Sequence, residues 1–171
     1  MKKARKACAF TGHRPKKLPW GYNEKDMRCV ALKAELERQI RLLIQEGVMD
    51  FLSGMAEGVD LLAAEIVLNL RAEYPGIKLH CILPCRGQEA EWLAAYQARY
   101  HTILEQADSI VYVSRIYRKN CMLERNRFLV AHSDVLLAVY NGEYRGGTAA
   151  TIRYAQKLGH SIIILDPSRI N

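Results

Sequence analysis

The chain has 171 residues, of which half are apolar and a quarter are charged. This balance excludes a disordered chain and is typical of a globular protein with one buried core. We therefore expect a single domain over residues 1–171, with residues 1–6 forming a solvated basic tail. The net charge of +7 favours anionic partners or simply solubility, and the positive excess gathers in residues 2–6, 13–17 and 115–119.

The sequence predicts neither a membrane span nor a secretion signal. No apolar run reaches the roughly 18 residues that a span requires. The basic start is followed by a short apolar segment, Ala7 to Phe10, which falls below the roughly 7 residues of a signal-peptide core. We expect a cytoplasmic protein with no membrane partner.

Five cysteines are scattered through the chain. Their odd number and the lack of a Cys-x-x-Cys pair argue against a disulfide framework and against a zinc site. We therefore expect reduced, structural thiols and no metal. The five are Cys8, Cys29, Cys81, Cys85 and Cys121.

Apolar segments that predict strands alternate with periodic segments that predict helices. Strands are expected at residues 8–11, 51–53, 79–83, 109–113, 135–140 and 161–165. The first helix is expected to open at Asn23 or Asp26 and to stop at Gly47, and the others to cover 59–70, 92–104, 125–131 and 148–158. This alternation predicts an α/β fold, a single Rossmann-like doubly wound domain with a mainly parallel sheet of about six strands and helices on both faces.

In such sheets, ligands bind beyond the carboxyl ends of the strands, where the strand order reverses. The unusual residues of this chain fall at those ends, in segments 11–15, 53–54, 86–87 and 141–148. We expect them to converge on one pocket.

Thr11-Gly12-His13-Arg14 offers a hydroxyl, a free backbone N–H and a guanidinium after the first strand. The planar fork of arginine matches phosphate oxygens, so Gly12 and Arg14 are predicted to bind phosphate rather than to form a plain turn. His13 is as well explained as a surface residue.

Glycines also mark the second junction, Ser53 to Asp60. Gly54 and Gly58 allow a tight turn and the close approach of a ligand. Asp60 falls in the first turn of a helix, where the dipole favours a carboxylate. Capping the helix, binding a ribose hydroxyl and ordering the glycine loop all remain open for Asp60.

Gly146-Gly147-Thr148 is the best phosphate candidate, because two glycines lead into a helix start that carries a hydroxyl. Asn126 is a poor helix former on a predicted short helix, so Arg125 and Asn126 join the candidates, although residues 124–127 also read as an exposed charged face. Tyr117, among basic residues 115–119, is better explained by a mobile surface loop than by base stacking.

No pattern typical of a catalytic nucleophile and its base is present. The candidate acids near the predicted site are Glu57, Asp60, Glu124 and Glu143, and spacing alone places none of them. The catalytic residues therefore stay unassigned, with Asp60, Glu124 and Glu143 as candidates.

The ordered motifs at 11–15, 53–60, 125–127, 133–134 and 146–148 resemble those of the SLOG superfamily, in particular its YpsA-like branch (domain of unknown function 1273). The resemblance runs from Ala9 to Leu165. It implies a bacterial protein that binds or senses a nucleotide or a nucleotide-derived ligand, such as ADP-ribose or an NAD-like molecule, and that self-associates in some cases. The ligand-binding residues would be Thr11, Gly12, His13, Arg14, Ser53, Gly54, Gly58, Asp60, Arg125, Asn126, Gly146, Gly147 and Thr148.

Two further families share some of these motifs and give alternatives. The DNA-processing protein A family, which binds single-stranded DNA, is similar at 53–60, 125–127 and 133–134. The "lonely guy" family, which cleaves nucleoside monophosphates, is similar at 122–126 and 146–148, but the position of its catalytic glutamate holds Thr151. A threonine cannot act as that carboxylate, so ligand binding is favoured over an N-glycosidic hydrolase or transferase.

Overall fold

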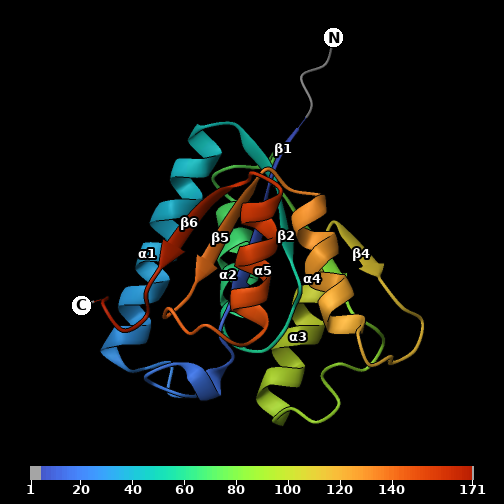
Figure 1. The fold of residues 1–171 in the computed structure, drawn as a ribbon. Helices are drawn as coiled ribbons and strands as arrows, with labels where there is room; N and C mark the ends of the chain where they lie inside the picture. Colours follow the sequence, from blue (N-terminus) through green and yellow to red (C-terminus); the bar gives the residue numbers. More distant parts are fainter. Residues whose placement is uncertain (1–4, 171) are drawn as a thin grey trace.

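The computed structural model describes residues 5–170. Its centre is a six-stranded sheet in the order β4-β3-β2-β1-β5-β6, with parallel pairing throughout (Figure 1). This arrangement confirms the doubly wound α/β fold expected from the alternating pattern. The strands are β1 (Lys6–Gly12), β2 (Val48–Ser53), β3 (Lys78–Leu83), β4 (Ser109–Tyr112), β5 (Val135–Val139) and β6 (Ser161–Leu165).

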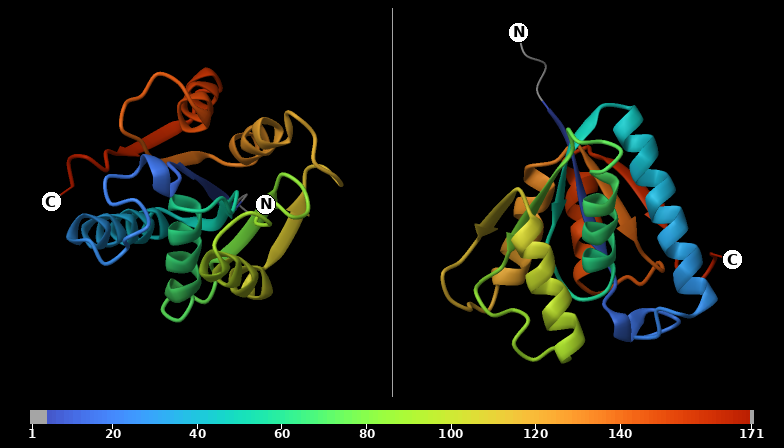
Figure 2. Two further views of the ribbon diagram at one scale, coloured as in Figure 1. Left: turned by 90° about the horizontal axis from the view of Figure 1, so that it is seen from below. Right: turned by 180° about the vertical axis from the view of Figure 1, so that it is seen from behind.

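Five α-helices cover the two faces of the sheet, as the view from below shows (Figure 2). Three pack side by side on one face: α1 (Met27–Gln45), α2 (Val59–Leu70) and α3 (Ala94–Gln106). Two pack together on the other: α4 (Cys121–Ala131) and α5 (Gly147–Lys157). A short 3-10 helix, η1 (Pro15–Lys17), follows β1. None of the helices within residues 5–170 combines the length and apolar character needed to cross a bilayer.

The sheet separates two apolar cores of different size. Alternate residues of β1 supply both, with Cys8 and Phe10 facing α1–α3, and Ala7 and Ala9 facing α4 and α5. Phe10 stacks on Phe51 of β2 with ring centroids 5.9 Å apart, so large side chains fill the first core. The second core is smaller and contains several alanines, among them Ala9, Ala138 and Ala155.

The cysteines and two tyrosines of α3 are buried. All five cysteines are buried and free, and burial raises the pKa values of Cys8 and Cys81 to about 12. Tyr96 and Tyr100 of α3 are 8% and 2% exposed, which makes them core residues of this chain.

Several element boundaries differ from the expected ones, among them the start of β2, which is Val48 rather than Phe51. β1 begins at Lys6, inside the stretch expected to be a solvated tail; residues 1–4 lie outside the described part. α3 begins at Ala94, and Trp92 lies in the preceding turn, where its ring meets Tyr100 edge-on. α4 begins at Cys121, one turn earlier than expected; the apolar residues of its first turn, Cys121 to Leu123, are consecutive and therefore show no helical period.

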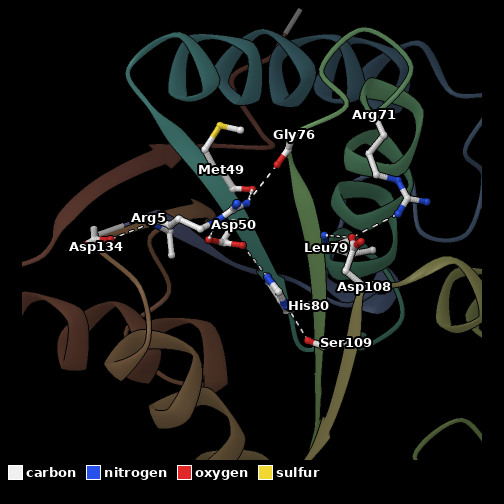
Figure 3. Close-up of polar contacts among 11 residues, drawn as sticks. Arg5, Met49, Asp50, Arg71, Gly76, Leu79, His80, Asp108, Ser109 and Asp134 are labelled. Atoms are coloured by element: carbon white, nitrogen blue, oxygen red, sulfur yellow. Dashed lines mark hydrogen bonds and ion pairs between the residues drawn. The ribbon is translucent and has the colours of Figure 1, made fainter. Parts of the chain in front are cut away.

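At the edge of the sheet where the strands begin, its amino-terminal edge, aspartate carboxylates accept hydrogen bonds from the backbone (Figure 3). Asp134 Oδ2 accepts a hydrogen bond of 2.8 Å from Ala7 N, and Asp108 Oδ2 accepts one of 2.8 Å from Leu79 N. Each carboxylate satisfies a backbone N–H near the start of its strand. Asp134 belongs to the Ser-Asp motif at 133–134, so that motif has a structural use here.

A polar chain runs across the same edge from β1 to β4 (Figure 3). Asp50 accepts hydrogen bonds from Arg5 Nε at 2.7 Å and from His80 Nε2 at 2.8 Å, while His80 Nδ1 lies 2.6 Å from Ser109 Oγ. Burial alone would raise the pKa of Asp50, but the hydrogen bonds from Arg5 and His80 outweigh burial and hold that pKa below its ordinary value. Arg5 is thereby tied to β2, which accounts for the early start of β1.

We expect Asp50→Asn to lower the free energy of unfolding by about 1–3 kcal/mol at pH 7, because both partners of the carboxylate lose a charged acceptor. The folded-state pKa lies below the unfolded one, so this stabilisation is complete above about pH 4 and is lost as the pH falls through the folded pKa. Urea unfolding of both proteins across this range measures it. A difference that stays constant down to pH 2 would contradict the assignment.

Candidate functional site

The strand order reverses between β1 and β5, and a cavity of about 380 Å³ lies at the carboxyl ends of these strands. In Figure 1 this is the lower side of the sheet, opposite the amino-terminal edge. Four segments line it: the end of β1 with η1, the β2–α2 loop with the start of α2, the first turns of α4, and the loop from β5 into α5. The sequence predicted convergence at this edge.

The lining contains most of the residues proposed from the sequence: Thr11, Gly12, His13, Arg14, Asp60, Arg125, Asn126, Gly146, Gly147 and Thr148. Ser53, Gly54 and Gly58 are not part of the lining. The segment at 86–87 is also absent from it, because β3 lies two strands from the switch point; Arg86 instead stacks on Tyr112.

Sequence reasoning missed five lining residues: Lys16, Lys17, Ala56, Met122 and Arg145. Met122 precedes Arg125 by three positions, so both face the cavity once α4 is known to begin at Cys121. Lys16 and Lys17 belong to the basic segment 13–17, whose charge is visible in the sequence although its position relative to the cavity is not. Arg145 directly precedes the glycine pair, and that neighbourhood was its only signal.

The lining is strongly cationic. It includes five basic side chains and, among its residues, one carboxylate, Asp60. Lys17 is paired with Glu143 at 2.8 Å, and both side chains are nearly half exposed. Such a concentration of positive charge in a crevice attracts anions. The basic side chains are Arg14, Lys16, Lys17, Arg125 and Arg145.

Arg125 is the most unusual of these cations because it is only 3% exposed. Its guanidinium donates to Gly54 O through Nη1 and to Asn126 Oδ1 through Nε at 2.9 Å. The contact of Nη2 is with the weak acceptor Met122 Sδ, at 3.8 Å. Burial lowers the pKa of Arg125, and the charge of Asp60 opposes this shift. A buried guanidinium that lacks a bound carboxylate is unfavourable, and an anion in the cavity would supply the counter-charge.

The glycine loop after β2 holds Arg125 in place. A Cβ at Gly54 would lie 2.7 Å from Arg125 Nη1, so only glycine leaves room for the guanidinium. Ser53 Oγ donates to Asp60 O at 3.0 Å and accepts from Met55 N at 3.2 Å. Ser53 and Gly54 therefore do not line the cavity themselves but position Arg125 and Asp60, which do.

Two other glycines are required by packing between loops. A Cβ at Gly12 would lie 2.5 Å from Val59 Cγ1, where α2 starts against the end of β1. Gly58 has φ +95° and its Cβ would lie 2.7 Å from His13 O. These contacts bring the loops after β1 and β2 together.

The start of α5 presents unpaired backbone donors to the cavity. Gly146 occupies the N-cap with φ 107°, and no side chain caps the helix. The N–H groups of its first turn are the ones that an α-helix leaves unpaired, and they bind anions readily. A Cβ at Gly147 would meet nothing closer than Asn126 Nδ2, at 3.8 Å, so the space in front of this residue is open.

His13 joins the loops after β1 and β5. Its ring is buried, and its Nε2 accepts a hydrogen bond of 3.1 Å from Asn141 N. This bond requires an unprotonated Nε2, so the ring carries its proton on Nδ1. Burial lowers the pKa of His13 more than the contact with Asn141 and the charge of Glu143 raise it.

The candidate acids have different positions. Asp60 lines the cavity. Glu124 pairs with Arg118 at 2.6 Å, Glu143 pairs with Lys17, and neither belongs to the lining. Glu57 accepts a hydrogen bond of 3.0 Å from Tyr22. Among the described residues, Asp60 is therefore the candidate acid that a ligand in this cavity meets.

Comparison with known proteins gives the same picture of the fold. The chain matches the family model described as the YspA SLOG family (YpsA) over residues 8–166. It belongs to this family. Two UPF0398 proteins are similar to it: one from Halalkalibacterium halodurans is 34% identical over 89% of this chain and 81% of its own, and one from Bacillus cereus is 32% identical over 94% and 90%.

A solved structure is similar to this YpsA-family chain in fold. It is DNA processing protein A from Helicobacter pylori, described for its single-stranded DNA binding mode. The TM-score is 0.61 with 20% identity, over 96% of this chain and 70% of that one. At this identity the likeness shows the Rossmann-like fold alone.

We expect the stability of this YpsA-family protein to fall as the pH drops from about 6.5 towards the lowered folded-state pKa of His13, because the unfolded chain binds the proton more readily. His13→Gln should lower the free energy of unfolding by about 1 kcal/mol at pH 8 and remove this part of the pH dependence. Denaturant unfolding at a series of pH values measures both. The matched change at exposed His101, His101→Gln, should keep the fall; an unaltered profile in His13→Gln would refute the role of His13.

Proposed function

We propose that this protein binds a nucleotide or a nucleotide-derived ligand in the cavity at the β1–β5 switch point, in the cytoplasm. The observation that carries the proposal is the buried Arg125, whose Nη2 faces no oxygen acceptor among the described residues while four further cations line the same cavity. A phosphate group supplies oxygens for both the guanidinium and the open start of α5.

The size of the cavity supports a ligand larger than inorganic phosphate. Its volume of about 380 Å³ lies within the range of roughly 300–1,000 Å³ typical of small-molecule sites. A second cavity, of about 110 Å³ between α4 and α5, shares Asn126 with it. Phosphates at the start of α5 with the remainder of the ligand extending past Asn126 fit a molecule such as ADP-ribose or an NAD-like dinucleotide.

The side chains around the cavity support binding rather than N-glycosidic cleavage. Thr151, at the position of the "lonely guy" glutamate, donates its hydroxyl to Gly147 O at 2.8 Å and is buried in α5. Glu124 and Glu143 are engaged by Arg118 and Lys17. These contacts leave Asp60 as the carboxylate closest to a bound ligand, and no paired acid and base accompanies it in the lining.

We expect Gly147→Asp to abolish binding of AMP, ADP-ribose or NAD while the protein stays folded, because the carboxylate enters open space where phosphate would lie. Binding is measured as the rise in thermal unfolding temperature; a ligand at 100 times its dissociation constant adds roughly 2.7 kcal/mol. Gly147→Asn, which has the same size without the charge, should weaken binding much less. If Gly147→Asp bound these nucleotides as tightly as the unchanged protein does, the proposal would be refuted.

Single-stranded DNA is the second candidate ligand. The basic cavity favours it, as does loop 115–119, in which Tyr117 is 71% exposed among Arg115, Arg118 and Lys119. The similar fold of the Helicobacter pylori protein adds to this support.

If single-stranded DNA is the ligand, the affinity for an oligothymidine should fall steeply with salt, since each neutralised phosphate releases counterions and contributes about −0.7 to the slope of log K against log [salt]. Fluorescence anisotropy between 50 and 300 mM salt measures it. Tyr117→Ala should weaken DNA binding by about 1–3 kcal/mol but leave nucleotide binding unchanged. An affinity that is absent or independent of salt would remove DNA as the ligand.

A further inference from the structure

Asp60 places a carboxylate in a cavity whose other charged side chains are all basic. It belongs to the first turn of α2, it is 7% exposed, and it lines the cavity together with the five basic side chains. Its Oδ2 accepts a hydrogen bond of 3.2 Å from Ala56 N and so orders the glycine loop. This contact explains one oxygen of the carboxyl group and leaves the other unexplained.

The second oxygen, Oδ1, is buried and has no hydrogen-bond partner among residues 5–170. Burial raises the pKa of Asp60, while the charges of Arg125 and Arg14 and the Ala56 contact oppose this shift. Arg125 nevertheless directs its donors to Gly54 O and Asn126 Oδ1 rather than to Asp60. A buried carboxylate oxygen without a donor is unfavourable, so Asp60, which lines the cavity, has a capacity to accept a hydrogen bond that the protein itself leaves unsatisfied.

The other groups of the cavity need the opposite partner. The cationic side chains and the first-turn N–H groups of α5 are donors, and phosphate oxygens satisfy them. Phosphate oxygens at neutral pH offer no hydrogen to Asp60 and repel its charge. The ligand that satisfies the whole cavity carries both a phosphate and a hydroxyl group.

We propose that the carboxylate of Asp60 accepts a hydrogen bond from a ribose hydroxyl, so that the cavity selects ribonucleotides or ribose phosphates over simple phosphates and over DNA. The inference rests on the proposed function and narrows it to a ligand class. A DNA strand carries no 2′-hydroxyl, and its internal 3′-oxygens are esterified, so it leaves Asp60 unsatisfied next to a phosphate charge.

The test compares AMP, 2′-deoxy-AMP and 2′,3′-dideoxy-AMP by isothermal titration calorimetry, with pyrophosphate as a ligand that has no sugar. We expect AMP to bind about ten- to hundredfold more tightly than the dideoxy compound, the factor that corresponds to one hydrogen bond to a charged group. In Asp60→Ala and Asp60→Asn this preference should shrink to near one, while pyrophosphate binds as well as before or more tightly.

Glu57→Gln is the matched control. Glu57 lies on the same loop, and its Oε2 is likewise buried without a partner, but it is not part of the cavity lining. The preference for AMP should therefore persist in this variant. If the Asp60 variants do not fold, the ligand series on the unchanged protein still decides whether a ribose hydroxyl is recognised, and equal affinities would overturn the inference.

Three results would overturn the inference. Equal affinities for AMP and the dideoxy compound would show that no hydroxyl is recognised, while the proposed nucleotide site would stand. A preference for AMP that survives in folded Asp60→Ala would show that another group recognises the hydroxyl. Failure of every ligand, pyrophosphate included, would refute the proposed function and the inference with it.

Discussion

The candidate site depends on one contact, the hydrogen bond that the guanidinium of Arg125 donates to Gly54 O. It joins the loop after β2 to α4, two segments from opposite faces of the sheet, directly across the switch point. The contact exists because Gly54 has no side chain, and Ser53 fixes the loop behind it. A buried cation is thus positioned before any ligand arrives, and binding need not reorganise it.

The two edges of the sheet differ in whether their buried polar groups have hydrogen-bond partners. At the amino-terminal edge, Asp50, Asp108 and Asp134 are each satisfied by backbone or side-chain donors, and these contacts stabilise the fold. At the carboxyl edge, the start of α5, Arg125 and Asp60 keep unmet donors and acceptors. Unmet buried groups lower stability, and proteins retain them where a ligand satisfies them.

Much of the fold could be predicted because strong local patterns specify it. The five-residue apolar run of β5 and the stripe of buried residues from Cys29 to Leu43 in α1 leave little ambiguity about element type. Convergence at the carboxyl edge then followed from the topology of parallel sheets. The start of α4 was missed because Cys121 to Glu124 lack a clear apolar period, and Met122 was lost with it.

The individual roles within the site were harder to predict than its location. Gly54 and Gly58 look like ligand contacts in the sequence, but their environment is set by Arg125 and His13, which are distant from them in the chain. Spacing carries no information on such contacts. The same limit applies to Lys16 and Lys17, whose charge was visible but whose direction depends on the turn that η1 makes.

The cavity is assembled from segments spread between Thr11 and Thr148, nearly the full length of the described chain. No single supersecondary unit contains it, since β1 must pair with β2 on one side and with the distant β5 on the other before its walls meet. An intermediate that lacks either pairing has no site. A ligand therefore binds only the fully folded chain. Its binding stabilises the pairing of the whole sheet rather than the conformation of one loop.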